Sequence, residues 1–177
     1  MRRLRYSVAV TLDGYIAGPN GEYDWIVADP AIDFAALYRQ FDAAVMGRKT
    51  FETAIQQGGS GEMPGMEVVV FSRTLRPQDH PKVTVLPGDP ARVVAGMKDR
   101  PGKDIWLFGG GALFRTLLDA ALVDTIELGV MPVLLGQGIP LLPGAAAQTR
   151  LRLTDSTRLP SGILMLKYDV ERPADPS

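Results

Sequence analysis

Short runs of apolar and β-branched residues recur along the chain, and each is bounded by polar residues, glycine or proline. Runs of this length and composition are typical of buried strands. The segments between them suit helices, most clearly from Phe34 to Phe41, where apolar residues recur at intervals of three and four after an opening Pro30. We predict strands at residues 5–10, 43–46, 67–71, 83–86, 105–108 and 125–130, and helices at residues 30–41, 48–57, 90–99 and 112–121.

Two segments, one near each end of the chain, depart from this alternation of strands and helices. Residues 12–29 are rich in glycine and are expected to form a long loop. Residues 151–159 and 163–170 resemble strands and flank Pro160-Ser161-Gly162, which predicts a hairpin. Alternating strands and helices with a final hairpin predict an α/β fold with a mainly parallel central sheet and an antiparallel edge. We interpret residues 1–171 as a single domain and the polar residues 172–177 as a flexible tail.

The composition is that of an ordinary globular protein. Of 177 residues, 46% are hydrophobic and 22% are charged, and the formal net charge is −1. This balance gives no reason to expect nucleic acid or a membrane as a partner. Thr11 and Asp13 interrupt the apolar stretch near the N-terminus, where a signal peptide would be unbroken. We therefore expect a cytoplasmic protein.

Few side chains are available for chemistry. The chain has no cysteine and a single histidine, His80, in a polar segment that is expected to be an exposed loop. This argues against disulfides, thiolate nucleophiles and a zinc centre, so we expect no metal site. Neither a G-x-S-x-G nor a G-x-x-x-x-G-K-[ST] segment is present. We therefore expect the chemistry to come from a bound cofactor.

Three consecutive glycines, Gly109, Gly110 and Gly111, stand between a predicted strand and a predicted helix. A helix N-terminus offers unpaired N–H groups and a partial positive charge, and glycine lets an anion approach the backbone. The segment does not match the dinucleotide fingerprint, because Phe114 occupies its sixth position. The glycines therefore indicate either a phosphate site or a tight turn without a ligand.

Cationic residues follow two other predicted strands and favour the phosphate site. Arg48 and Lys49 come directly after Gly47, and Arg73 follows Ser72. In open α/β sheets, ligands bind beyond the carboxyl ends of the strands. The glycines would then face a pyrophosphate, and the two arginines a further phosphate. A ribose 2′-phosphate would make the cofactor NADPH rather than NADH.

The ordered segments TLDGYIAG, DWI, VMGRKTFE, VVVFSRT, LFGGGALF and PVLLGQGIPLL resemble the dihydrofolate reductase superfamily. They are most similar to the reductase domain of the bifunctional riboflavin-synthesis deaminase–reductase. The similarity extends from about Tyr6 to Tyr168. It implies a three-layer dihydrofolate reductase-like domain, an NADPH-dependent reductase and a homodimer.

The resemblance also implies which residues bind the cofactor. GRKT corresponds to a segment that contacts the cofactor phosphates, SR to the 2′-phosphate site, GGGALF to the pyrophosphate turn and TLDGYIAG to the loop over the nicotinamide. The implied residues are Gly47, Arg48, Lys49 and Thr50, then Ser72 and Arg73, then Gly109, Gly110, Gly111, Ala112 and Leu113, and finally Ala9, Asp13, Gly14 and Ile16.

Two acids and two aromatic residues are candidates on the substrate side. Asp33 lies where dihydrofolate reductases place an acid against the pterin, although an acid in a first helical turn also favours the helix dipole. Asp13 is a second candidate acid, although Asp13-Gly14 is equally a turn dipeptide. Tyr23 and Trp25 are candidates for the pocket wall, with core packing as their alternative role.

The substrate is less well defined by the sequence. Riboflavin reductases use a D-x-P-x-L-T-type segment for their substrate, and here FETAIQQGGSGEMPG stands in that place. We predict hydride transfer from NADPH to a small heterocyclic or imine/carbonyl-like substrate, for example 5-amino-6-(5-phosphoribosylamino)uracil or a pterin such as dihydrofolate. The alternatives are a non-catalytic NADP(H)-binding regulatory module, or a structural domain whose glycines form tight turns.

Overall fold

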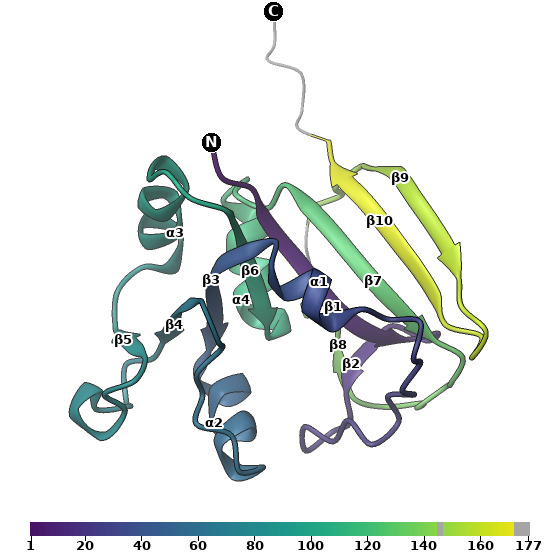
Figure 1. Ribbon diagram of the computed structural model, residues 1–177, viewed down its shortest axis with the longest axis horizontal. Coiled ribbons are helices and arrows are strands. Elements are labelled where there is room, and N and C mark those ends of the chain that lie inside the picture. The colour runs from purple at the N-terminus through teal and green to yellow at the C-terminus, as the bar shows by residue number, and fades with distance from the viewer. Residues whose placement is uncertain (145–146, 172–177) are drawn as a thin grey trace, which may run out of the picture.

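The computed structural model describes residues 1–144 and 147–171, and the expected tail at residues 172–177 lies outside them. An eight-stranded sheet with the order β5-β4-β3-β6-β1-β7-β10-β9 forms its centre (Figure 1). The strands of this sheet are β1 (Leu4–Thr11), β3 (Phe41–Gly47), β4 (Glu67–Phe71), β5 (Thr84–Leu86), β6 (Asp104–Gly109), β7 (Thr125–Met131), β9 (Leu151–Arg158) and β10 (Leu164–Val170). The helices are α1 (Phe34–Tyr38), α2 (Arg48–Gln56), α3 (Pro90–Asp99), α4 (Gly111–Asp119) and a 3-10 turn, η1 (Pro77–Asp79).

The pairing of the strands confirms the predicted mainly parallel sheet. All neighbours from β5 to β7 are parallel, whereas β10 runs antiparallel to both β7 and β9. The register between β1 and β7 places Ser7 beside Glu127 and Ala9 beside Gly129. The parallel strands therefore deliver their carboxyl ends to one edge, where ligands bind in such sheets.

Helices cover the sheet on both faces, which confirms the three-layer arrangement. In β4, Val69 packs into the core that α3 and α4 cover, while Val68 and Val70 pack with Phe51 of α2. This alternation follows from the twofold periodicity of a strand. We call the second side, on which α1 also lies, the α1/α2 face. None of the helices within the described residues has the length and hydropathy needed to cross a membrane.

The helix predicted from Pro30 to Phe41 is wrong in its extent. Helix α1 begins only after Asp33, whose side chain caps it, and it ends at Tyr38. Phe41 opens β3 instead and is 2% exposed, whereas Phe34 of α1 is 52% exposed. Apolar spacing alone could not separate these roles, because Phe41 continues the helical repeat and also starts a buried strand.

A small second sheet was not predicted. Strand β2 (Tyr15–Ala17) lies inside the expected long loop and pairs with β8 (Ile139–Pro140). The loop is further fixed by a hydrogen bond from the Leu141 N–H to the Gly14 carbonyl, with an N···O distance of 2.9 Å. Both strands are too short for a periodic pattern. They nevertheless hold the residue 12–29 segment against the end of the sheet.

Candidate cofactor and substrate site

Two helices begin at the carboxyl ends of neighbouring parallel strands, and neither has a side-chain cap. Gly47 precedes α2 after β3, and Gly110 precedes α4 after β6. By contrast, Asp33 and Asp89 cap α1 and α3 through their carboxylates. The first N–H groups of a helix need an acceptor from outside the helix. At α2 and α4 no side chain supplies that acceptor, so both N-termini can accept an anionic ligand.

The glycine turn is packed against the start of α2. A Cβ placed on Gly109 or Gly110 would lie 3.3 or 3.2 Å from the Thr50 hydroxyl oxygen. A Cβ on Gly111 would lie 2.8 Å from the carbonyl oxygen of Pro140 in β8. Position 111 therefore requires glycine, because the neighbouring backbone leaves no room for a side chain. At Gly47, in contrast, a Cβ would meet nothing within 4 Å.

The cations predicted to bind phosphate differ in their surroundings. Arg48 forms an ion pair with Glu52, one turn along α2, at 2.9 Å. Arg73 is exposed and has no carboxylate partner within the described part of the chain. Ser72 is 8% exposed, and its hydroxyl oxygen accepts from the N–H groups of Thr74 and Leu75 at 3.1 and 3.0 Å. This turn leaves the Arg73 guanidinium free to bind an anion.

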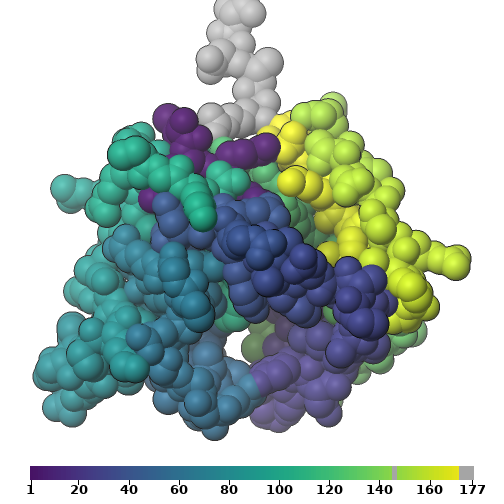
Figure 2. All heavy atoms as spheres, in the orientation of Figure 1, coloured from purple at the N-terminus to yellow at the C-terminus, as the bar shows by residue number. Residues whose placement is uncertain are grey.

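The remaining predicted cofactor residues lie around the same edge. Lys49 is exposed in the first turn of α2, and Ala112 is exposed in the first turn of α4. Leu113 is 7% exposed and belongs to the core behind the glycine turn. Ile16, in β2, and Ala9, in β1, are both half-buried. Figure 2 shows a hollow between α2 and the β2 segment.

The structure uses Asp13 to fix the loop that carries it. Its carboxylate accepts from the Thr11 hydroxyl at 2.5 Å and from the backbone N–H groups of Leu135 and Gly136 at 3.1 and 2.7 Å. Gly14 follows with a φ of +88°, as the predicted turn requires. The Thr11 hydroxyl and these N–H groups lower the pKa of Asp13. Asp13 thus ties the β1–β2 loop to residues 135–136.

We predict that Asp13→Asn destabilises the protein at neutral pH and that the difference from the wild type shrinks below about pH 4. Because the folded pKa is lowered, ionised Asp13 stabilises the folded state above its unfolded pKa. This contribution is lost as the pH falls through the folded pKa. Urea unfolding of both proteins from pH 3 to pH 7 measures the difference.

Asp155→Asn is the control for this measurement, because Asp155 lies on the exposed strand β9 and its carboxylate forms no hydrogen bond or ion pair within the described residues. Its free energy difference from the wild type, measured over the same pH range, serves as the baseline. If the difference for Asp13→Asn does not shrink at low pH relative to this baseline, the assigned role of the Asp13 carboxylate is contradicted.

The other substrate-side candidates occupy less central positions. Asp33 is exposed, and its Oδ1 accepts from the Ala36 N–H at 2.8 Å, as expected of a helix cap. Tyr23 is 41% exposed. Trp25 packs beside the cluster of Met131, Leu159 and Ile163, and its indole N–H donates to the Glu22 carbonyl at 3.1 Å. Of these candidates, Trp25 is the one held against the sheet.

Sequence reasoning missed a partly exposed strip of the sheet on the α1/α2 face. Because side chains alternate along a strand, Arg5, Ser7 and Ala9 of β1 share this face. Ser7, Ala9 and Phe108 of the neighbouring strand β6 are only half-buried, although they lie in the middle of the sheet. Phe108 packs against the clusters around Phe51 and Phe41, and Ala9 packs against the cluster of Met131, Leu159 and Ile163, so both are covered in part. A period-two pattern shows which residues share a face but not whether another element covers them.

Arg5 lies on the same face of β1, and several neighbouring side chains bind its guanidinium. It is 6% exposed and binds both carboxylate oxygens of Glu127 at 3.0 and 2.9 Å. It also donates to Gln40 at 2.8 Å and to Asp104 at 3.3 Å. Its guanidinium carbon lies 4.6 Å from the ring centre of Phe41. These partners come from distant parts of the sequence, so no local motif indicated the cluster.

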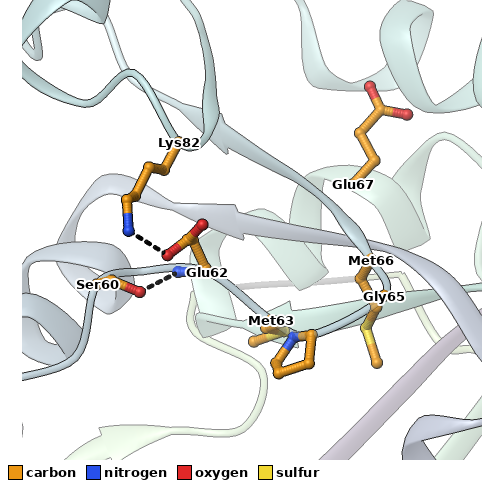
Figure 3. Close-up of a pocket in the computed structure, with 8 residues that line it drawn as sticks. Ser60, Glu62, Met63, Gly65, Met66, Glu67 and Lys82 are labelled. Carbon is orange, nitrogen blue, oxygen red and sulfur yellow. Dashed lines mark hydrogen bonds and ion pairs between the residues drawn. The ribbon is translucent and has the colours of Figure 1, made fainter.

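A cavity of about 640 Å³ lies elsewhere, at the amino end of β4. Figure 3 shows its two carboxylates, Glu62 and Glu67, with Lys82 directed at Glu62. The Lys82–Glu62 ion pair measures 2.8 Å. Since its one cation is already paired, this cavity is poorly suited to phosphate. Within the described residues, no group of three or more histidine, aspartate or glutamate side chains is arranged to hold a metal ion.

Comparison with known proteins places this site in a family context. Residues 2–165 match the RibD C-terminal domain. The Bacillus subtilis protein YyaP is 35% identical over 178 residues, covering 94% of both chains. A putative riboflavin biosynthesis protein from Shewanella shares 26% identity with a TM-score of 0.81, covering 97% of this chain and 100% of that one. Enterococcus faecalis dihydrofolate reductase, solved with NADP(H), shares the fold with a TM-score of 0.66 at 17% identity, covering 96% of this chain and 97% of that one.

Proposed function

The chain belongs to the RibD C-terminal domain family, and from this premise we propose that it is an NADPH-dependent reductase acting on a small substrate with a C=N or C=O bond. The observation that carries the proposal is the pair of helix N-termini without side-chain caps at the ends of β3 and β6. Such termini attract phosphate through free N–H groups and the helix dipole. Two of them side by side suit a pyrophosphate.

The neighbouring side chains support NADPH over NADH. Arg73 is exposed and unpaired within the described residues, and Ser72 shapes the turn that presents it. An arginine without a carboxylate partner is available for a 2′-phosphate, which its planar fork can bind through two hydrogen bonds. Arg48 has a partner in Glu52 and would have to exchange it for phosphate. We therefore assign the larger share of 2′-phosphate binding to Arg73.

The protein's own residues position the reaction. When bound, NADPH supplies a hydride to the carbon of the substrate double bond and is thereby oxidised to NADP⁺. Ala9 and Ser7 would form the floor beneath the reacting rings, and the loop that Asp13 fixes follows Ala9 at the end of β1. Asp13 and Asp33 are both engaged in backbone hydrogen bonds. We therefore propose that water protonates the nitrogen or oxygen of the substrate.

Calorimetric titration with NADPH and NADH tests the cofactor assignment directly. We expect NADPH to bind and NADH to bind at least about tenfold more weakly, because NADH lacks the phosphate that faces Arg73. Spectrophotometry of NADPH oxidation with carbonyl and imine compounds then tests the activity. Binding without turnover would favour a regulatory module, and failure of both dinucleotides to bind would overturn the proposal.

A further inference from the structure

The C-terminal hairpin of β9 and β10 is polar on one face and apolar on the other. On the α1/α2 face, Lys167 forms an ion pair with Glu127 at 3.2 Å. Arg152 and Asp169 form another on the same face, at 2.7 Å. The opposite face is apolar, because side chains alternate along a strand. We call it the apolar hairpin face; it consists of Leu164, Leu166, Tyr168 and Val170 of β10 and Leu151 and Leu153 of β9.

The apolar hairpin face lies on the side of the sheet that α3 and α4 cover, but these helices do not extend over it. Leu166 and Tyr168 stand beside Leu128 and Ile126 of β7, and Ile126 belongs to the core beneath the two helices. In Figure 1, β9 and β10 lie on the far side of β7 from α3 and α4. All eight residues of β9 are accordingly exposed.

Three leucines of the apolar hairpin face are accessible to solvent although they belong to a sheet. Leu151, Leu153 and Leu164 are 41%, 52% and 39% exposed. An antiparallel strand with alternating side chains normally packs its apolar side on a core and leaves its polar side in water. A contiguous apolar surface that is left open marks an interaction site. The alternation in this hairpin therefore indicates a face that a partner covers.

The size of this surface suits a second sheet. Leu128 and Val130 of β7 are half-buried beside the hairpin and extend the apolar surface to a third strand. Three strands of about seven residues, with a rise of about 3.4 Å per residue and a spacing of about 4.8 Å, present a face of roughly 24 Å by 14 Å. Side chains that stand up from the sheet enlarge its accessible area, so two such faces together approach the roughly 1,000 Å² of a specific interface.

Two other occupants match the apolar hairpin face poorly. Residues 172–177, which follow β10, have the sequence RPADPS and contain no large apolar side chain. Arg158 is the one charged residue of β9 and β10 on this face, whereas surfaces that bind anionic membranes gather several cations. A second sheet with the same twist can instead stack on the face at about 10 Å. A second copy of the chain supplies such a sheet.

We propose that two copies of the chain pack their apolar hairpin faces against each other in a two-fold symmetric homodimer. The same residues of each copy then form the interface, as two-fold symmetry requires. Leu151 and Leu153 become buried, and Arg158, which stands opposite Leu164 at the end of the hairpin, lies at the polar rim. The proposal is independent of the reductase function.

Analytical ultracentrifugation of the full chain tests the proposed dimer. We expect the wild type to sediment with twice the chain mass of 19.2 kDa. Leu153→Glu should raise the dissociation constant of the dimer by about a hundredfold or more, because the two-fold symmetry buries the new charge twice. Leu151→Glu, at the neighbouring position of the same face, should act in the same direction. Circular dichroism verifies that each variant is folded, as expected for changes at exposed positions.

Phe34→Glu is the matched control, since Phe34 is also 52% exposed but belongs to α1 on the α1/α2 face. This variant should dimerise like the wild type. A wild type that stays monomeric at its highest soluble concentration, or that binds phospholipid vesicles in place of dimerising, would overturn the proposal. So would a dimer that Leu153→Glu and Leu151→Glu both leave intact, or one that Phe34→Glu weakens equally.

Discussion

Replacement of Arg73 by alanine is expected to weaken NADPH binding by roughly ten- to a hundredfold and to leave NADH binding nearly unchanged. A charge-assisted hydrogen bond contributes about 1.5–3 kcal/mol, and each 1.4 kcal/mol corresponds to about tenfold in affinity. Arg73 has no carboxylate partner within the described residues, so its removal breaks no internal ion pair and should not perturb the fold. Calorimetric dissociation constants for both cofactors measure the effect.

Arg76→Ala provides the matched control, three residues further along the chain. Arg76 is exposed like Arg73 but forms an ion pair with Asp79 at 2.9 Å. It changes the net charge by the same amount, so any general electrostatic effect on a charged cofactor appears in both variants. If the two variants lose NADPH affinity equally, or if Arg73→Ala loses NADPH and NADH affinity equally, the 2′-phosphate assignment is contradicted.

Elements with strong local chemistry could be predicted closely from the sequence. Helix α3 begins at Pro90 and ends at Asp99, as expected, because Asp89 caps it and proline fits its first turn. Strand β4 likewise spans Glu67–Phe71, since its β-branched run is buried on both faces. In such segments the local preference and the tertiary environment favour the same structure.

Other features depend on contacts between residues that are distant in the sequence, so local sequence patterns could not predict them. Phe41 continues a helical repeat, yet Trp106, stacked on it at 5.3 Å, holds it in β3. The buried Arg5 cluster joins residues as far apart as Gln40 and Glu127. The ring contact between Tyr38 and Trp106 joins α1 to β6. These arrangements require knowledge of which strands are neighbours, and β6 lies between β3 and β1 although it follows both in sequence.

The sequence correctly located the glycine turn but left its cause open between a ligand and a tight turn. The structure divides the three glycines. Gly110 leaves the N-terminus of α4 without a side-chain cap, as a phosphate site would need. Gly111 is instead pressed against β8, with the Pro140 carbonyl oxygen, the Pro143 ring and the Leu141 carbonyl oxygen all within 3.3 Å of its would-be Cβ. One short motif therefore combines a candidate ligand site with a packing constraint.

Gly111→Ala is accordingly expected to destabilise the protein, even though alanine is the better helix former. The propensity gain in a helix is about 0.5–1 kcal/mol. The steric cost of forcing atoms into a packed site is about 1–3 kcal/mol, and at Gly111 two of the nearest atoms are backbone oxygens that cannot rotate away. The steric cost should prevail and lower the Tm by roughly 2–8 °C.

Gly96→Ala, in the exposed middle of α3, isolates the steric contribution, because a Cβ there meets nothing within 4 Å. It should raise the Tm through propensity alone, so the two variants are expected to shift stability in opposite directions in thermal or urea unfolding. Displacement of β8 in Gly111→Ala should also disturb its partner β2 and the Leu141 N–H bond to Gly14, and thereby weaken NADPH binding. A Gly111→Ala protein as stable as the Gly96→Ala protein would show that β8 moves freely, and the third glycine would then have to be explained by the ligand.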